Sequence, residues 1–501
     1  MLTDNSKSIK AEEQKQGMKS LAKDTAIYGL SSIVGRFLNY LLVPIYTHVI
    51  TASTGGYGVV TNLYAYTALI LVILTFGMET TFFRFANKDD EDPHTVFSTT
   101  MAMVGTLSLL FVAGVFIFIN PISEMLGYAN HKSYILMMAS VVALDALQAV
   151  PFSYLRYKKK AIKFASLKLL FIILNIGLNL LYFVVLGKND VAYVFLLNLV
   201  CTGLITFFFI PELMRIEWQF DLSLLGRMFS YSWPILILGV AGILNQAFDK
   251  MIFPWAYTRT GLHTMAEAQT QLGIYGACVK IAMIMAMITQ AFRYAYEPIV
   301  FAKSKDKDSK SYYAHAMKFF LIFTLLAFLF VMAYMDILKL IIGADYREGL
   351  ATVPIVMAAE IMMGIYFNLS FWYKLIDKTI WGAFFSIAAC AVLIAVNIFF
   401  IPEYGYMACA WGGVAGYGTA MILSYIVGQR KNPIKYPMKS MTFYVLMTAL
   451  FFTVMQILPD TMPVWEKLII NTGMIIAFIA HILYHDMPLA SLPLVGRYFR
   501  K

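Results

Sequence analysis

The stretch from Tyr57 to Phe83 reads YGVVTNLYAYTALILVILTFGMETTFF and is long and apolar enough to cross a lipid bilayer. Parts of this stretch return 218 residues later, and the same offset relates two further segments. The matched residues are Tyr57, Gly58, Ala68, Ile70, Glu79 and Phe83 with Tyr275, Gly276, Ala286, Ile288, Glu297 and Phe301; Lys160 with Lys378; and Asn179, Gly187 and Ala192 with Asn397, Gly405 and Ala410. A constant offset across intervening loops predicts an internal duplication. Duplicated helical bundles are typical of secondary transporters, whose substrate sites lie between the repeats near the bilayer midplane.

The whole chain has the composition of an integral membrane protein. Of its 501 residues, 60% are hydrophobic and 14% are charged, and the mean hydropathy is +0.70. Apolar runs of about twenty residues, the length needed to cross the hydrocarbon core, predict about fourteen spans. They start near Thr25, Tyr57, Thr95, Ser133, Ile162, Val191, Met228, Leu272, Ser311, Gly349, Ile380, Tyr406, Lys439 and Val464.

The positive charges predict the orientation of the chain in the membrane. Of 39 Lys and Arg residues, 29 fall in the two tails and the even-numbered loops, 6 fall in the odd-numbered loops, and the other 4 lie within spans. The positive-inside rule then places both termini in the cytoplasm. The net charge of +10 is explained by this topology, so it gives no reason to expect a nucleic-acid partner.

The repeat predicts an all-α membrane fold with two lobes. Because 218 residues cover six helices, an even number, the two lobes have the same orientation and are related by a parallel pseudo-twofold axis. We expect a cytoplasmic tail at 1–20, an N-lobe at 21–213, a C-lobe at 222–428, an appended pair of helices at 437–485 and a cytoplasmic tail at 486–501.

Two corresponding helices, spans 1 and 7, carry polar stripes on otherwise apolar sequences. At about 100° per residue, one side of span 1 collects Tyr28, Ser32, Arg36 and Asn39, and one side of span 7 collects Asn245, Gln246, Asp249 and Lys250. The two stripes predict a hydrated cleft between the lobes.

Cations within the spans are candidates for binding an anionic substrate. An Arg at the centre of a span costs about 2.5–3.5 kcal/mol on insertion scales, so Arg36 is expected to meet water or an anion. One hypothesis is a phosphate-bearing substrate, which suits its planar fork, and the other is a structural ion pair. Lys280 and Arg293 on span 8 either line the cavity or extend toward the two membrane faces.

Carboxylates within the spans are the second candidate group. Asp145 on span 4 and Glu360 on span 10 lie at nearly corresponding depths, and either is a candidate for coupling to H⁺ or Na⁺; the alternative is a structural ion pair. Glu79 and Glu297 match across the repeat near the cytoplasmic span ends, where they are gate contacts or simply solvated charges.

We expect no cofactor and no metal. The four cysteines and seven histidines are dispersed, without CxxC or HExxH spacing. The sequence has no GxxxxGK[ST] loop, which argues against direct use of ATP.

Several short motifs, taken in their order and spacing, carry a family resemblance. They are Ala26-Ile27-Tyr28-Gly29-Leu30-Ser31-Ser32-Ile33-Val34-Gly35-Arg36, Pro44, Tyr57-Gly58, Gly343, Tyr346, Gly349, Asn368-Leu369-Ser370-Phe371-Trp372-Tyr373-Lys374, Asn397, Ile401-Pro402 and Gly405. From about residue 20 to 430 the chain resembles the polysaccharide and O-antigen flippases of the multidrug/oligosaccharidyl-lipid/polysaccharide exporter superfamily.

The resemblance implies alternating-access flipping of an undecaprenyl-diphosphate-linked oligosaccharide across a bacterial inner membrane. The product would serve O-antigen, capsule or exopolysaccharide assembly, with membrane lipids and polymerase or chain-length proteins as partners. It also implies that the cavity cations, Arg36, Lys250, Lys280 and Arg293, hold the diphosphate.

Two other functions remain as alternatives. A cation-coupled multidrug exporter of the same superfamily predicts an acid-rich aromatic cavity. A membrane-embedded lipid-sugar polymerase or ligase predicts a large outer loop with convergent Arg and His, whereas the longest loop, Tyr257 to Gln271, is short and poor in charge. The sequence therefore favours a transporter over an enzyme.

Overall fold

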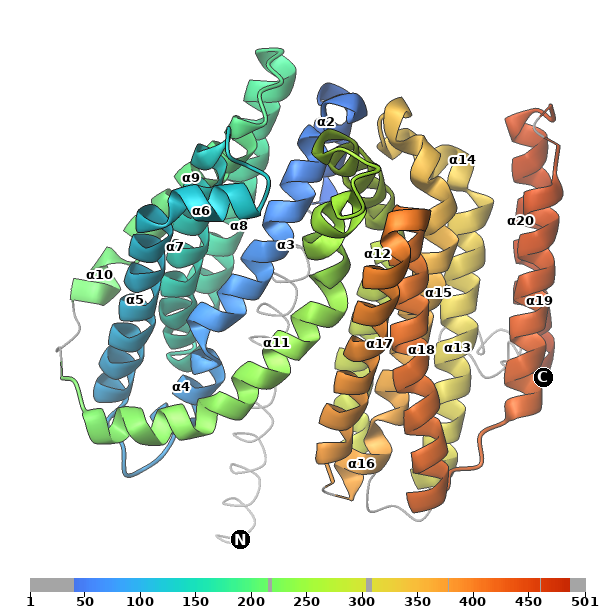
Figure 1. Ribbon diagram of the computed structural model, residues 1–501. Helices are drawn as coiled ribbons and strands as arrows, with labels where there is room; N and C mark the ends of the chain where they lie inside the picture. Colours follow the sequence, from blue (N-terminus) through green and yellow to red (C-terminus); the bar gives the residue numbers. More distant parts are fainter. Residues whose placement is uncertain (1–39, 215–218, 303–308, 377, 460, 487–501) are drawn as a thin grey trace, which may run out of the picture. The chain divides into compact units, whose positions relative to one another are not determined.

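The computed structural model describes residues 40–214, 219–302, 309–376, 378–459 and 461–486. Across these ranges the chain is helical and has no β-strand (Figure 1). Twelve of the described helices are long and apolar enough to cross a membrane. The predicted all-α membrane fold is confirmed.

The two other predicted spans are the first and the sixth. The first begins near Thr25 and lies mostly outside the described residues; only its end appears, as α2 (Leu42–Val49). The sixth is α9 (Ala192–Phe207), an apolar helix of 16 residues, which is shorter than the other spans.

The chain divides into two compact units, each described here by itself. The first unit extends to Trp255 and also contains His263–Gly273, and the second contains Ala256–Leu262 and the chain from Ile274 onward. The first unit therefore includes most of α11, the helix that the repeat assigns to the start of the second lobe.

The helices of the first unit follow one another with short connections. They are α2, η1 (Ala52–Thr54), α3 (Gly56–Thr75), α4 (Met78–Ala86), α5 (Pro93–Ile117), α6 (Ile119–Met125), α7 (Lys132–Tyr157), α8 (Ala161–Asn179), the π-helical turn η2 (Leu180–Val185), α9, α10 (Ile210–Met214) and α11 (Leu222–Thr258). Helix α7 packs against α3, α5 and α9, so it forms the centre of this unit.

The second unit starts within a long helix and ends with the appended pair. Its elements are α12 (Met265–Ala302), α13 (Ser309–Ala333), α14 (Met335–Leu338), η3 (Lys339–Ile341), η4 (Ala344–Ala351), α15 (Thr352–Leu369), α16 (Phe371–Leu375), α17 (Ile380–Tyr404), α18 (Tyr406–Lys431), α19 (Met438–Ile457) and α20 (Val464–His485). The offset of 218 residues places α5 on α13, α8 on α17 and α9 on α18, so the repeated sequence corresponds to repeated helices.

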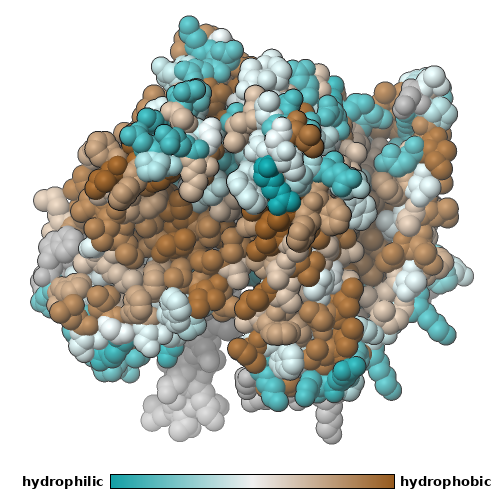
Figure 2. All heavy atoms as spheres, viewed as in Figure 1, coloured by the Kyte–Doolittle hydropathy of each residue, from teal (hydrophilic) through white to brown (hydrophobic). Residues whose placement is uncertain are grey.

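Each unit carries an apolar surface at mid-height. In both units Figure 2 shows hydrophobic residues over the middle of the helices and hydrophilic residues toward their ends. Large apolar side chains are exposed on these helices, among them Leu110, Phe116 and Phe399 at 62%, 68% and 70% exposure. Such a surface is stable in contact with acyl chains but would be an aggregation site in water.

Local sequence explains where the helices begin and break. Asp92 caps α5, because its Oδ2 accepts a hydrogen bond from Thr95 N at 2.9 Å and Pro93 fills the first helical position. This hydrogen bond lowers the pKa of the exposed Asp92 carboxyl. The second span is interrupted between α3 and α4, where Phe76 (φ +51°) and Gly77 (φ +68°) both adopt left-handed backbone.

The appended pair is attached to α13 near both of its ends. Asn471 Nδ2 on α20 donates to the Ala333 carbonyl at 3.0 Å, and Tyr334 Oη and Thr472 Oγ1 share a hydrogen bond of 3.0 Å. At the other end Lys318 Nζ and Tyr444 Oη both donate to the Asp486 carboxylate. We call Lys318, Tyr444 and Asp486 the α20 clasp.

Candidate functional site

The predicted site falls partly outside the described residues. Tyr28, Ser32, Arg36 and Asn39 of the first polar stripe lie there, so their roles stay predictions. The second stripe, on α11, is described. It lies beside Pro254, a proline within α11 that removes one backbone hydrogen bond of the helix.

Pro254 leaves a backbone carbonyl of α11 without its usual partner. In a regular helix the carbonyl of Lys250 would accept a hydrogen bond from residue 254, but proline has no N–H to donate. Asn62 Nδ2 on α3 donates to this carbonyl at 2.7 Å, and also to the Met251 carbonyl at 3.2 Å. Tyr66 Oη donates to the Met251 carbonyl at 3.0 Å. The kink is therefore stabilised by side chains from the neighbouring helix.

Asn62 is itself held in position by a further buried side chain. Tyr128 Oη donates to Asn62 Oδ1 at 2.8 Å, and the two residues are both 1% exposed. The Nδ2 group of Asn62 is thus hydrogen-bonded to α11, while its Oδ1 atom is bonded to Tyr128. We call Asn62, Tyr66 and Tyr128 the kink cluster.

The charged end of the second stripe lies beside the kink cluster. Lys250 Nζ donates to both Asp249 carboxylate oxygens, at 3.0 and 2.9 Å. Asp249 is 8% exposed and Lys250 is half-buried. The Lys250 ammonium is therefore partly neutralised by its sequence neighbour.

The polar residues one turn earlier differ in exposure. Asn245 Nδ2 donates to the Ala241 carbonyl at 2.9 Å within α11, whereas the Gln246 side chain is exposed. The polar stripe predicted on α11 thus contains one side chain that is hydrogen-bonded within the helix, Asn245, and one that is exposed, Gln246.

Helix α12 carries Lys280 and Arg293, the two other cations that were predicted within spans. Lys280 and Arg293 are both half-buried, and no acidic residue separates them along the helix. The Arg293 guanidinium lies over the Phe367 ring of α15, with 4.9 Å between Cζ and the ring centroid. This contact holds one face of the guanidinium against an aromatic ring.

The first unit contains a charged cluster of two carboxylates that were predicted separately and one lysine. Asp145 on α7 and Glu79 on α4 both interact electrostatically with Lys168 on α8. Lys168 Nζ also lies 3.9 Å from the Phe152 ring centroid. Lys168 is one of the 29 cations that the sequence analysis counted in the tails and even-numbered loops. Because α8 begins at Ala161, this residue instead lies about two turns inside the helix. The sequence signal was the apolar run that starts near Ile162, because this run already contains Lys168.

In the first unit, side-chain amides and phenols form a hydrogen-bonded network that is buried except at Tyr64. Tyr46 Oη donates to Asn179 Oδ1 at 2.8 Å, and Asn179 Nδ2 donates to the Asn175 carbonyl and side-chain oxygens at 2.8 and 3.2 Å. Asn175 Nδ2 lies 3.5 Å from Asn198 Oδ1, and Asn198 Nδ2 donates to Tyr64 Oη at 2.8 Å. Tyr64 interacts electrostatically with Asp145, so this network connects α2 to the charged cluster.

This network was not predicted from the sequence, in which Asn179 was identified only as a residue repeated at Asn397. The signal was present, because Asn175 and Asn179 are separated by four residues in an apolar span and therefore share one helix face. The partners Tyr46 and Tyr64 come from distant segments, which periodicity along a single helix does not reveal.

The predicted carboxylates also differ in exposure. Glu360 is half-buried on α15, and Glu79 is exposed on α4. Glu297 lies within α12, and its side chain is outside the described part of the molecule.

The four cysteines are buried as single free thiols. Among the described residues, no group of three His, Cys, Asp or Glu side chains is arranged to hold a metal ion. Anion binding by Lys280 and Arg293, and ion coupling at Asp145 or Glu360, stay predictions.

Comparison with solved structures supports this fold. A lipid II flippase MurJ in an inward closed conformation shares 15% identity, with a TM-score of 0.71, over 91% of this chain and 98% of that one. An inward-facing multidrug resistance MATE family transporter shares 14% identity, with a TM-score of 0.62, over 81% of this chain and 97% of that one. A transporter of the same superfamily from Pyrococcus furiosus shares 15% identity, with a TM-score of 0.51, over 81% and 95%. At such identities the likeness establishes the two-lobed fold.

Sequence comparison establishes the family. Among curated proteins, none matches the chain. A family profile described as "Polysaccharide biosynthesis protein" matches residues 53–351, which is more than half of the chain. The chain therefore belongs to this polysaccharide biosynthesis protein family, whose helical bundle here has the fold of the MurJ and MATE transporters.

Proposed function

We propose that this protein is an alternating-access flippase that moves an undecaprenyl-diphosphate-linked oligosaccharide from the inner to the outer leaflet. The product would be used for surface polysaccharide assembly, as O-antigen, capsule or exopolysaccharide. The observation that carries the proposal is the polysaccharide-biosynthesis match on a membrane bundle whose helix α12 bears Lys280 and Arg293 with no intervening acid. The similar structure of the lipid II flippase MurJ supports the proposal, since that protein flips a lipid.

The cations distinguish this proposal from the exporter alternative. A diphosphate requires cations, and Arg293 presents a guanidinium fixed on Phe367. An exporter of cationic drugs would place acidic groups there instead. The MATE-like fold alone does not separate the two, because both activities occur on related bundles.

The proposal assigns roles to the candidate residues. Arg36, Lys280 and Arg293 bind the diphosphate, and Lys250 contributes when its pairing with Asp249 is exchanged. Tyr28, Ser32, Asn39, Asn245 and Gln246 supply hydrogen bonds to sugars. Asp145 and Glu360 are the candidate coupling carboxylates, and Glu79 and Glu297 are the candidate gate residues.

The proposed driving force follows from the charge of the substrate. An inside-negative potential favours outward movement of an anion by about 2.3 kcal/mol per charge per 100 mV. Coupling to H⁺ or Na⁺ through Asp145 or Glu360 would add to this force. We place the protein in a bacterial inner membrane with both termini in the cytoplasm, in the company of polymerase or chain-length proteins.

Complementation of a deletion strain tests the proposal. Arg36→Ala and Arg293→Ala should each reduce surface glycan at least about tenfold, because one charge-assisted contact contributes about 1.5–3 kcal/mol. The lipid-linked intermediate should accumulate in the cytoplasmic leaflet. Arg36→Lys and Arg293→Lys should restore part of the export, because a lysine keeps the charge but loses the fork geometry.

Arg259→Ala is the matched control, since Arg259 is exposed in the loop after α11. It should export glycan like the wild type at equal protein abundance. Normal export by both alanine variants would remove these arginines from the mechanism. If the deletion strain keeps its surface glycan but loses resistance to cationic dyes, the exporter function replaces the proposed one.

A further inference from the structure

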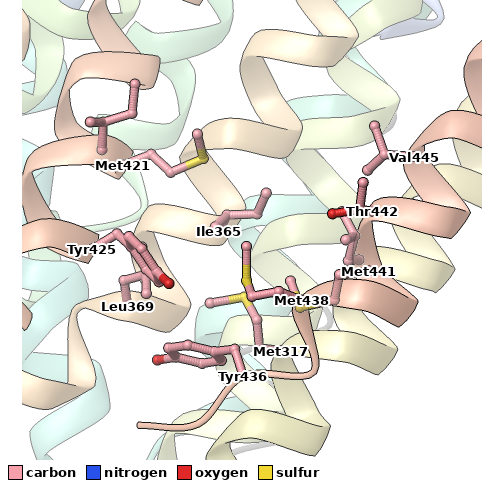
Figure 3. A pocket seen from close by; sticks show the side chains of 12 residues that line it. Met317, Ile365, Leu369, Met421, Tyr425, Tyr436, Met438, Met441, Thr442 and Val445 are labelled. Carbon is pink, nitrogen blue, oxygen red and sulfur yellow. The ribbon is translucent and has the colours of Figure 1, made fainter. Parts of the chain in front are cut away.

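A cavity lies between α19 and the helices α13, α15 and α18 of the second unit (Figure 3). Its volume is about 320 Å³, within the range of small-molecule pockets. The lining residues are Met317, Leu321, Ile365, Leu369, Met421, Ile422, Tyr425, Tyr436, Met438, Met441, Thr442 and Val445. Apart from three hydroxyl groups, these side chains are hydrocarbon or thioether.

The cavity has a buried floor and an exposed lip. Met317 and Leu321 on the floor are 1% and 4% exposed, whereas Ile422 and Val445 at the lip are 53% and 44% exposed. Figure 3 shows Met317, Met421, Met438 and Met441 surrounding a common space. Methionine side chains adapt to irregular apolar ligands, so the site fits a flexible hydrocarbon chain entering from the bilayer.

A small polar recess adjoins this apolar cavity. It shares Leu369, Tyr425 and Tyr436 with the cavity and adds, among others, Ser424, Gln429 and Asn432, with a volume of about 10 Å³. An apolar chamber next to polar groups is suited to a molecule with both a hydrocarbon part and a polar part.

Three exposed lysines lie next in sequence to residues of these two pockets. Lys431 precedes Asn432, Lys435 precedes Tyr436, and Lys439 follows Met438. None of the three forms an ion pair with a side chain that the structure describes. The positive-inside rule assigns this lysine-rich segment to the cytoplasmic face.

We infer that the cavity binds one acyl chain of an anionic phospholipid from the cytoplasmic leaflet. The lipid phosphate lies among Lys431, Lys435 and Lys439, and the chain occupies the space between α13 and α19. This lipid is a bound partner and is not the transported molecule, because the three lysines belong to a single membrane face and hold the headgroup there. The inference goes beyond the flipping of a lipid-linked oligosaccharide.

Native mass spectrometry of the purified full-length protein tests the inference. The delipidated protein in detergent is titrated with phosphatidylglycerol or with phosphatidylcholine of the same chains. We expect one tightly retained phosphatidylglycerol and no retained phosphatidylcholine. Because each lysine near an anionic headgroup contributes about a fivefold gain in affinity, the triple variant Lys431→Gln, Lys435→Gln and Lys439→Gln should bind at least tenfold more weakly.

A matched triple variant tests whether lipid binding depends on these three lysines or only on the total positive charge of the protein. The triple variant Lys158→Gln, Lys159→Gln and Lys160→Gln removes three exposed lysines from a loop of the first unit that is predicted to lie on the same face. It should retain phosphatidylglycerol like the wild type. A loss of binding equal to that of the first triple variant would overturn the inference.

Two valines of α19 test the chain site. Val445 lines the cavity and Val454 does not, although their exposures are similar, 44% and 39%. Val445→Trp should fill the cavity and abolish retention, whereas Val454→Trp should leave it unchanged. Equal behaviour of the two variants contradicts the site.

The occupant is identified by competition. Undecaprenyl phosphate at equal concentration should not displace phosphatidylglycerol; displacement would mean that the cavity belongs to a transported polyprenyl tail. Equal retention of phosphatidylglycerol and phosphatidylcholine would also refute the inference. These assays contain no oligosaccharide substrate, so their outcome is independent of the transport test.

Discussion

Asn179 and Asn397 occupy equivalent positions in the two repeats, and both are fully buried. Asn179 bonds to Tyr46 and Asn175, whereas neither the Nδ2 nor the Oδ1 atom of Asn397 has a hydrogen-bond partner within the described residues. Asn175 and Asn198 correspond by the same offset to Leu393 and Gly416. The duplication therefore preserved the amide and lost its polar surroundings in the second unit.

Replacing each amide by leucine, which has a similar shape, should give opposite results. Asn179→Leu leaves the Tyr46 hydroxyl without its buried acceptor and should destabilise the protein by about 1–3 kcal/mol. Asn397→Leu removes a buried polar group that has no partner and should be neutral or stabilising. Thermal unfolding of the purified variants measures the difference, and equal destabilisation would contradict this account.

The kink cluster allows a double-mutant test. Asn62→Leu removes the donor to the Lys250 carbonyl and the acceptor of Tyr128, and should cost about 1–2 kcal/mol, near the upper end of measured values for membrane proteins. Pro254→Ala restores a backbone N–H at position 254. In that background the cost of Asn62→Leu should fall, because the carbonyl regains its intrahelical bond.

The control is Asn87→Ala, which removes a local hydrogen bond of an exposed residue to the Phe83 carbonyl. Its cost should be within about 0.5 kcal/mol, as for surface substitutions in general. Strict additivity of Asn62→Leu and Pro254→Ala would show that the kink does not depend on the cluster.

At the scale of residues, the sequence predicts which polar side chains lie within spans better than it predicts the residues that they contact. It identified Asn245, Lys250, Lys280 and Arg293 as polar groups within spans, because a charge in an apolar run is visible without a structure. It could not identify the Phe367 contact of Arg293 or the Asp145 to Lys168 interaction, since both join helices that are distant in sequence.

Among the elements, α20 is held at its C-terminal end by the α20 clasp, in which Asp486 accepts hydrogen bonds from Lys318 and Tyr444. Burial opposes ionisation of Asp486, but the hydrogen bonds from Lys318 and Tyr444 outweigh it and hold the pKa of this carboxyl below its ordinary value. Its stabilising contribution is therefore complete above pH 3.8, the ordinary value, and is lost as the pH falls through the lowered pKa.

Asp486→Asn should therefore lower the stability by about 1–2 kcal/mol at neutral pH, the scale of a charge-assisted hydrogen bond. The difference between wild type and variant should shrink as the pH falls below 3.8, which thermal unfolding across a pH series measures. Asp336→Asn is the control, because its pair with Lys339 is more exposed and is expected to contribute about 0.5 kcal/mol or less. A pH-independent difference would exclude the clasp as the source.

At the scale of the whole molecule, hydropathy and the repeat were sufficient for the fold class. Spans are visible in the sequence because each must be apolar over its full length. The boundaries of the compact units were harder to predict, because the sequence gives no indication that α11 belongs to the first unit as far as Trp255.

The orientation of the whole chain is open to direct measurement. The four native cysteines are buried, so labelling of the wild type should be low. Lys188 and Thr260 lie in exposed loops on the predicted outer side. The variants Lys188→Cys and Thr260→Cys should therefore react with a membrane-impermeant maleimide in intact cells. Lys159→Cys and Lys431→Cys should react only after permeabilisation. The reverse pattern would invert the topology.

Gly58 passes so close to α12 that a Cβ atom at this position would overlap the carbonyl oxygen of Gln269. Any substitution of Gly58 adds a Cβ atom, which would push the backbone of α3 away from that of α12. No side-chain rotamer can relieve this overlap. In a saturation library selected for surface glycan, this codon should therefore return glycine alone. Neighbouring Val59, whose side chain already packs in the core, should accept other aliphatic residues.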